Sequence, residues 1–95
     1  MFTYFLLKSA NNNYLNDGYA QSGKKAYDGI VEKLIKENTD GTISLTQVCG
    51  VAGLGGDPYR DGTYEYYINE VIRDNDPKGV GPFIMASLEF EELIK

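Results

Sequence analysis

The chain has 95 residues, enough for one small domain, with 42% hydrophobic and 24% charged residues as in ordinary globular proteins. Its formal net charge of −5 argues against a nucleic-acid partner, because such binding depends on lysine and arginine at the phosphates. A single cysteine, Cys49, and the absence of histidine exclude an internal disulfide and argue against a metal site. No apolar run is long enough for a membrane span.

The first predicted element is a helix over residues 1–9. Phe2, Phe5 and Leu6 follow helical spacing, and the Asn-rich run at 11–13 ends the element. No capping residue stands before Met1, so we expect a helix that lacks its beginning. The apolar run is short and has no basic residue ahead of it, so it is a poor secretion signal. The compartment therefore stays open, with the cytoplasm as the default expectation.

A second helix is predicted over residues 19–38. It carries an apolar stripe at helical spacing, formed by Tyr27, Ile30, Val31, Leu34 and Ile35. The run 38–41, Asn-Thr-Asp-Gly, is a strong helix stop and turn. Residues 42–48 begin with alternating polar and apolar residues, which indicates a short extended segment.

The glycine-rich stretch CGVAGLGGDPYRDG, residues 49–62, predicts an irregular surface loop. It lacks the ending of a phosphate-binding loop and the glycine spacing of a dinucleotide site. A last helix is predicted over residues 83–94, with Pro82 in its first turn. Its apolar residues point in nearly every direction, so this helix needs neighbours on more than one side. We expect the chain to assemble with copies of itself or to form part of something larger.

Two stretches carry candidate binding residues. In RDGTYEYY, residues 60–67, Arg60 can bind a carboxylate and Tyr64 can stack on a sugar. The alternative is a simple turn at Asp61-Gly62 followed by tyrosines at a helix edge. No acid in the chain stands in an apolar setting that would clearly raise its pKa, and Cys49 has no histidine partner for nucleophilic catalysis.

The second stretch, NDPKGVGP, residues 75–82, precedes the last helix. Free backbone N–H groups at a helix start favour an anion, and Lys78 adds a positive charge. Gly79 and Gly81 would let a ligand approach the backbone closely. The alternative is an N-terminal cap punctuated by proline.

With their spacing, these two stretches resemble the C-terminal end of the unsaturated rhamnogalacturonyl hydrolases. These enzymes form glycoside hydrolase group 88/105 together with the unsaturated glucuronyl hydrolases. The resemblance runs the whole length of the chain, and RDGTYEYY and NDPKGVGPF are its most specific pieces. It implies an all-α fold: residues 1–95 would be the C-terminal helical hairpins of an (α/α)6 barrel, with a long irregular loop before the last helix.

The same resemblance implies an activity. Enzymes of this group act on oligosaccharides released by pectin lyases, which carry a 4,5-unsaturated uronic acid at the non-reducing end. An aspartate protonates the vinyl ether double bond and activates a water. The hydrated sugar is an unstable hemiketal that opens and leaves. No metal and no organic cofactor take part.

The catalytic aspartates of the group lie in the N-terminal part of the barrel, which has no counterpart in this chain. No catalytic residue is therefore expected here, and the 95 residues alone are expected to be inactive. The resemblance places the loop before the last helix at the barrel mouth. This makes Lys78, Gly79 and Gly81 the first candidates for substrate contact and Arg60 and Tyr64 the second. Asn75 and Asp76 would hold the loop in shape.

Two other hypotheses stay open. The chain could be a helical self-assembly module derived from the same fold, without catalysis or sugar binding. It could also assemble an active site across copies from the acids between Asp57 and Asp76. The hydrolase-fragment hypothesis predicts exposed apolar helix faces, and hence a homo-oligomer or a domain-swapped assembly that covers them. The self-assembly module predicts a stable species with a closed core instead.

Overall fold

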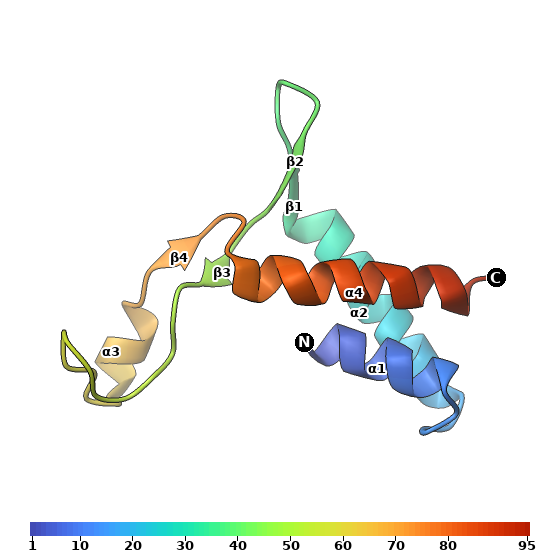
Figure 1. Ribbon diagram of the computed structural model, residues 1–95, viewed down its shortest axis with the longest axis horizontal. Helices are drawn as coiled ribbons and strands as arrows, with labels where there is room; N and C mark the ends of the chain where they lie inside the picture. The colour runs from blue at the N-terminus through green and yellow to red at the C-terminus, as the bar shows by residue number, and fades with distance from the viewer.

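The computed structural model describes all 95 residues as three long helices, one short helix and two small sheets (Figure 1). The helices are α1 (Phe2–Asn11), α2 (Gly18–Lys33), α3 (Tyr64–Ile68) and α4 (Pro77–Leu93). The strands are β1 (Ile35–Glu37), β2 (Ile43–Leu45), β3 (Val48–Cys49) and β4 (Ile72–Arg73). About half of the residues are helical, so the all-α prediction is correct only in part.

The three long helices hold the apolar core of the chain. Leu7 of α1 is its one fully buried large side chain, and Ala86 of α4 is buried as well. Gly23 of α2 lies directly against Leu7, since a Cβ there would come within 3.0 Å of a Leu7 methyl group. The absence of a side chain at Gly23 therefore lets α1 and α2 approach closely.

An aromatic stack joins α2 to α4. The Tyr27 ring lies 4.3 Å from the Phe90 ring and 5.8 Å from the Phe83 ring, measured between centroids, and nearly parallel to both. Its hydroxyl donates a hydrogen bond to Ser87 Oγ at 2.9 Å. Tyr27, the first residue of the predicted apolar stripe, thus packs against the last helix.

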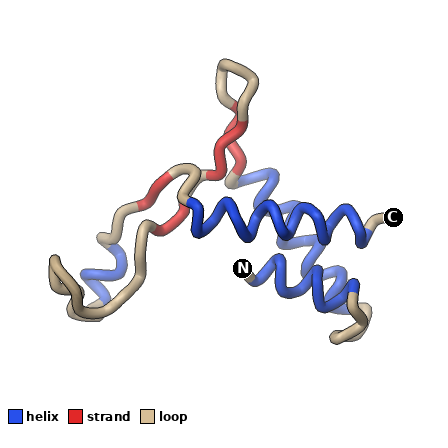
Figure 2. Tube along the Cα trace, viewed as in Figure 1, coloured by secondary structure: helices blue, strands red, loops and turns tan.

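A β-hairpin stands out from the bundle where the sequence predicted more helix (Figure 2). The helix prediction over residues 19–38 is wrong beyond Lys33, because Ile35–Glu37 pair antiparallel with Ile43–Leu45. The Asn38 amide donates to the Thr42 carbonyl at 2.8 Å, which closes the turn. The β-branched Ile35 and Ile43 suit paired strands, so tertiary pairing outweighs the helical spacing.

The rest of the chain between β3 and β4 forms an arm directed away from the bundle (Figure 1). It comprises residues 50–71 and includes α3. Its base is the antiparallel pair of Val48 with Arg73 and Cys49 with Ile72. Inside the arm, Gly55 and Arg60 exchange two backbone hydrogen bonds of 2.8 and 3.0 Å. The predicted irregular loop is therefore internally paired.

The last helix begins six residues earlier than predicted. Asp76 is its N-cap and Pro77 occupies its first position, where a missing N–H costs nothing. Pro82, which the sequence placed at the helix start, lies inside α4. A capping aspartate followed by proline is the stronger start signal.

The chain as a whole is flat and open. Its extents are 46 × 37 × 17 Å and its radius of gyration is 15.8 Å, against about 12 Å for a compact domain of this length. Only eight residues are buried. Large apolar side chains are exposed on α1 and α4, among them Phe2, Phe5, Ile84 and Leu88. No helix is both long and apolar enough to cross a membrane.

Candidate functional site

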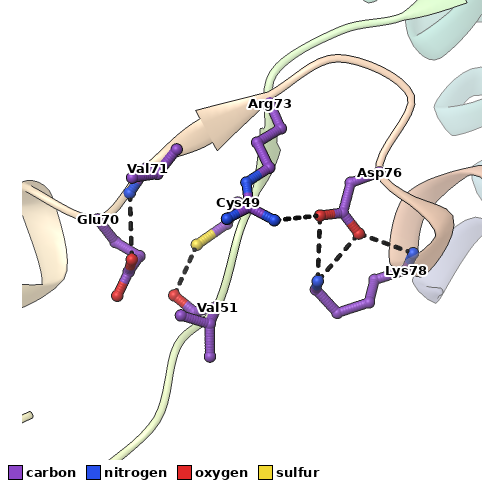
Figure 3. Close-up of polar contacts among 7 residues, drawn as sticks. All are labelled: Cys49, Val51, Glu70, Val71, Arg73, Asp76 and Lys78. Atoms are coloured by element: carbon purple, nitrogen blue, oxygen red, sulfur yellow. Dashed lines mark hydrogen bonds and ion pairs between the residues drawn. The ribbon is translucent and has the colours of Figure 1, made fainter. Parts of the chain in front are cut away.

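The loop between β4 and α4, together with the start of α4, holds the first group of predicted site residues, and the Asp76 carboxylate is its centre (Figure 3). Asp76 is buried, with 5% of its surface exposed, and its Oδ1 accepts a hydrogen bond from the backbone N–H of Lys78 at 3.0 Å. The Lys78 ammonium lies 2.9 Å from Oδ1 and 3.1 Å from Oδ2. The Arg73 guanidinium reaches Oδ2 from β4, at 3.6 Å. One carboxylate thus caps α4 and holds two cations.

The first turn of α4 offers no free backbone donor. Pro77 has no N–H, and the N–H of Lys78 is bound to the Asp76 side chain. The amides of Gly79 and Val80 both donate to the Asp76 carbonyl, at 2.9 and 3.0 Å. The sequence-based argument for free amides at this helix start is therefore wrong. Positive charge at this end of α4 comes from the Lys78 and Arg73 side chains instead.

Asn75 ties the loop to β2. Its backbone is left-handed, with φ of 57°, a conformation that asparagine tolerates better than most residues. Its side-chain oxygen accepts from the Leu45 amide at 2.9 Å, and its amide group donates to Ser44 Oγ at 3.1 Å. Its backbone N–H also donates to the Leu45 carbonyl at 2.7 Å. These are the contacts that a loop-shaping role requires, and the role itself stays a prediction.

The two candidate glycines of α4 have different surroundings. A Cβ on Gly79 would lie 2.7 Å from one Val48 methyl group and 3.3 Å from a Leu45 methyl group, so Gly79 is needed for packing against the β2–β3 segment. A Cβ on Gly81 would meet no atom within 4 Å. Of the two, Gly81 leaves open space beside the helix backbone, and substrate contact at either position stays a prediction.

Arg60 and Tyr64 belong to the arm, apart from the start of α4 (Figure 1). The Arg60 guanidinium lies 4.0 Å from the Glu70 carboxylate and against Gly56. The Tyr66 hydroxyl forms a hydrogen bond with the Glu70 carboxylate and thereby lowers the pKa of Glu70. The same hydroxyl accepts a hydrogen bond from the Gly53 backbone amide at 3.3 Å. These contacts surround a polar pocket of about 490 Å³ on the arm. Tyr64, at the start of α3, is 73% exposed.

The predicted site residues thus form two groups, one at the start of α4 and one on the arm. No three potential ligands among His, Cys, Asp and Glu come together anywhere in the chain. The arrangement at α4 can attract an anion through two side-chain cations. On the arm, the contacts of Arg60 with Glu70 and of Tyr66 with Gly53 join one part of the arm to another.

The sequence profile of Glycosyl Hydrolase Family 88 matches residues 1–94. The chain belongs to this family. The resemblance predicted from RDGTYEYY and NDPKGVGPF is thereby confirmed. A solved glycoside hydrolase from family 105 of C. acetobutylicum ATCC 824 supports it, with 47% identity and a TM-score of 0.88. That comparison covers 94% of this chain and 25% of the solved one.

Two bacterial proteins are also similar to this family 88 chain. Protein Atu3128 of Agrobacterium fabrum and the 24.9 kDa protein in the picA locus of Rhizobium radiobacter are each 39% identical to it over 95 residues. Each comparison covers 94% of this chain and 41% of the relative. The family 88 chain therefore spans less than half the length of these curated relatives.

Sequence reasoning missed two charged residues of this family 88 chain. Arg73 pairs with Asp76, and Glu70 pairs with Arg60. The spacing of three residues between Arg73 and Asp76 was visible in the sequence. It indicates an ion pair only when the structure shows that β4 ends at Arg73 and that the chain then turns towards α4. No local pattern signals the pair of Arg60 and Glu70, because it depends on how the arm folds back.

Acid should weaken the family 88 chain through Asp76. The Lys78 side chain, and then its backbone amide, lower the pKa of Asp76 below the ordinary value of 3.8 by hydrogen bonding to the carboxylate. A carboxylate with a lowered pKa stabilises the fold above pH 3.8, and this contribution is lost as the pH falls towards the lower value. In Asp76→Asn we expect less stability at about pH 6 and a smaller deficit at about pH 3.

Urea unfolding at both pH values measures the effect. Asp28→Asn is the matched control, because Asp28 lies on the exposed side of α2 and forms no ion pair. An Asp76→Asn deficit that stays the same at both pH values would show that the ionised carboxylate of Asp76 does not contribute in this way.

Proposed function

We propose that this chain is the C-terminal part of an (α/α)6 glycoside hydrolase acting on unsaturated uronyl oligosaccharides from pectin or rhamnogalacturonan. Its role is to form one wall of the substrate cleft. The match to Glycosyl Hydrolase Family 88 over residues 1–94 carries this proposal. The catalytic aspartates lie elsewhere in the barrel, so the 95 residues alone do not turn over substrate.

The open shape of the chain supports a role within a larger barrel. Three long helices bury only Leu7 and Ala86 as an apolar core, while Phe2 is 86% and Leu88 63% exposed. Such faces need to be covered, since contiguous exposed apolar surface marks an interaction site. Further helices of the same barrel would cover both α1 and α4.

The chemistry assigns the chain an electrostatic role. An aspartate protonates the vinyl ether double bond, an activated water adds to it, and the resulting hemiketal opens, so that the sugar that leaves no longer carries the double bond. The uronate keeps its carboxylate throughout this reaction. The Lys78 ammonium has 60% of its side-chain surface exposed beside α4 and can hold that carboxylate while the double bond is hydrated.

A chimera tests the proposal. The part of the C. acetobutylicum family 105 hydrolase that matches this chain is replaced by the 95 residues, which are 47% identical to it. Loss of the ultraviolet absorbance of the substrate double bond measures turnover by the parent hydrolase, the chimera and the isolated chain. We expect turnover by the parent and the chimera and none by the chain alone. An inactive but folded chimera of an active parent would contradict the proposal.

Within the chimera, Lys78→Ala should raise KM about tenfold with little change in kcat. A surface cation that holds the substrate carboxylate equally in ground and transition states contributes to binding alone. The backbone N–H of Lys78 still donates to the Asp76 cap in this variant, because the substitution changes only the side chain. Lys36→Ala, at an exposed β1 residue without an ion pair, is the matched control. An unchanged KM in Lys78→Ala would remove Lys78 from the site.

The exposed helix faces also favour a second candidate function, a non-catalytic self-assembly module. In that case copies of the chain would cover Phe2, Phe5 and Leu88 for one another. Native mass spectrometry of the chain gives the size of the assembly. A closed oligomer together with an inactive chimera would favour this function over the hydrolase.

A further inference from the structure

Arg73 is a cation that the proposed function does not use, and its position is fixed by its surroundings. It ends β4, where its backbone pairs with Val48 of β3. Its guanidinium passes over the buried Gly50, since a Cβ at that position would lie 3.3 Å from Nε. It then reaches Asp76 Oδ2 at 3.6 Å (Figure 3). The side chain is therefore held between the ladder of the arm and the start of α4.

Arg73 and Lys78 share one carboxylate and keep spare hydrogen-bond donors. Their side chains are 58% and 60% exposed, while the Asp76 side chain between them is 3% exposed. The Asp76 ion pair is the one ion pair that Arg73 makes, so most of its five N–H donors have no partner within the chain, although its charge also acts on the Glu70 carboxylate. Asp74 balances the formal charge of this stretch, but it is exposed and joins no ion pair. Two cations thus stand beside a single buried anion.

The geometry points to a two-cation site. We propose that Arg73 and Lys78 together bind a carboxylate of the uronyl substrate, with Asp76 as the positioning residue that holds both. The planar guanidinium fork matches a carboxylate with two parallel hydrogen bonds, and the ammonium adds a point charge. This inference rests on the proposed function for the identity of the substrate. The carboxylate belongs either to the unsaturated residue or to the sugar next to it.

Direct binding tests the site without any turnover. The chain is titrated with galacturonate and, separately, with neutral galactose, while the side-chain N–H signal of Arg73 is followed by NMR. We expect galacturonate to shift this signal, galactose to leave it in place, and about 0.5 M salt to suppress the shift by screening. Arg73→Gln should weaken galacturonate binding about tenfold and Arg73→Lys less, because lysine keeps the charge. Asp74→Asn should strengthen it, since it removes a nearby negative charge.

A purely structural role for Arg73 predicts a different result. Arg73→Gln would then lower the unfolding midpoint in urea while leaving galacturonate binding unchanged, and this outcome would overturn the inference. An Arg73 signal that does not respond to galacturonate in the unsubstituted chain would overturn it as well. Neither result depends on whether the chimera is active, so failure of this inference and failure of the proposed function are distinguishable.

Kinetics in the active chimera identify which carboxylate is bound. Two substrates share the unsaturated galacturonyl residue, one with galacturonate next to it and one with neutral rhamnose. If Arg73→Gln raises KM for both substrates, the carboxylate that Arg73 binds is that of the unsaturated residue. A rise for the first substrate alone assigns the neighbouring sugar. No rise for either would show that Arg73 does not bind the substrate.

Discussion

Gly79→Ala should destabilise the chain, and the same substitution at Gly81 should not. At Gly79 the new methyl group would lie 2.7 Å from one Val48 methyl carbon and 3.1 Å from the other. Overpacking of this kind costs about 1–3 kcal/mol, which exceeds the gain of about 1 kcal/mol from placing alanine in a helix. At Gly81 the methyl group meets nothing, so the helix gain of about 1 kcal/mol remains.

Urea unfolding of both variants measures this difference, and a third variant tests its cause. Val48→Ala removes the two methyl groups that the Gly79 substitution would meet. The double variant Gly79→Ala with Val48→Ala should therefore recover much of the stability that Gly79→Ala loses, as a coupling between neighbours. Equal effects at the two glycines would mean that the β2–β3 segment does not pack on α4 at Gly79. Loss of turnover in a stable Gly81→Ala chimera would in turn indicate substrate contact at Gly81.

Tyr27→Ala should cost about 3 kcal/mol, a large share of the stability of so open a chain. The substitution removes the ring that stacks on Phe90 and Phe83, and it leaves Ser87 without its hydroxyl donor. We expect the helical signal in far-ultraviolet circular dichroism to fall and the urea midpoint to drop sharply.

Tyr27→Phe separates the ring from its hydroxyl. It keeps both stacked pairs and loses the hydrogen bond to Ser87 Oγ, whose own hydroxyl still donates to the Phe83 carbonyl at 2.9 Å. A loss of about 1 kcal/mol is expected for one neutral hydrogen bond. If Tyr27→Phe were as damaging as Tyr27→Ala, the hydroxyl and not the ring would join α2 to α4.

The elements that the sequence predicted well are those with a strong helical period. The helix expected over residues 1–9 is α1, and most of the one expected over 19–38 is α2. Both could be predicted because their apolar residues repeat along one face. The extended segment expected over 42–48 contains β2 and the start of β3.

The errors occurred where distant residues decide the conformation. Leu34 and Ile35 continue the apolar stripe of α2, yet Thr46 donates two hydrogen bonds to the Leu34 carbonyl and draws the chain into the hairpin. At α4, two prolines five residues apart each suit a helix start, and only the capping contact of Asp76 selects Pro77. α3 was not predicted as a separate helix, because five residues are too few to show a period.

The candidate site was predictable by residue type and less so by geometry. Lys78 and Asp76 were identified from the family pattern, and the structure joins them in one ion pair. Arg73 was missed because it belongs to the strand before the loop, and its partner becomes visible only when β4 is placed. Arg60 was identified as a carboxylate ligand, and the structure supplies that carboxylate from Glu70 of the chain itself.

The base of the arm is held by few hydrogen bonds, and this couples the opening of the arm to ligand binding. Two strands of two residues each, with one further hydrogen bond of 2.6 Å from the Gly50 amide to the Val71 carbonyl, close the base of residues 50–71. A unit held by so few bonds opens at a lower free energy than the whole fold. Arg73 lies in this base, whereas Lys78 belongs to the bundle. A carboxylate bound between them would favour the closed arm, and by thermodynamic reciprocity a closed arm would raise the affinity for that carboxylate.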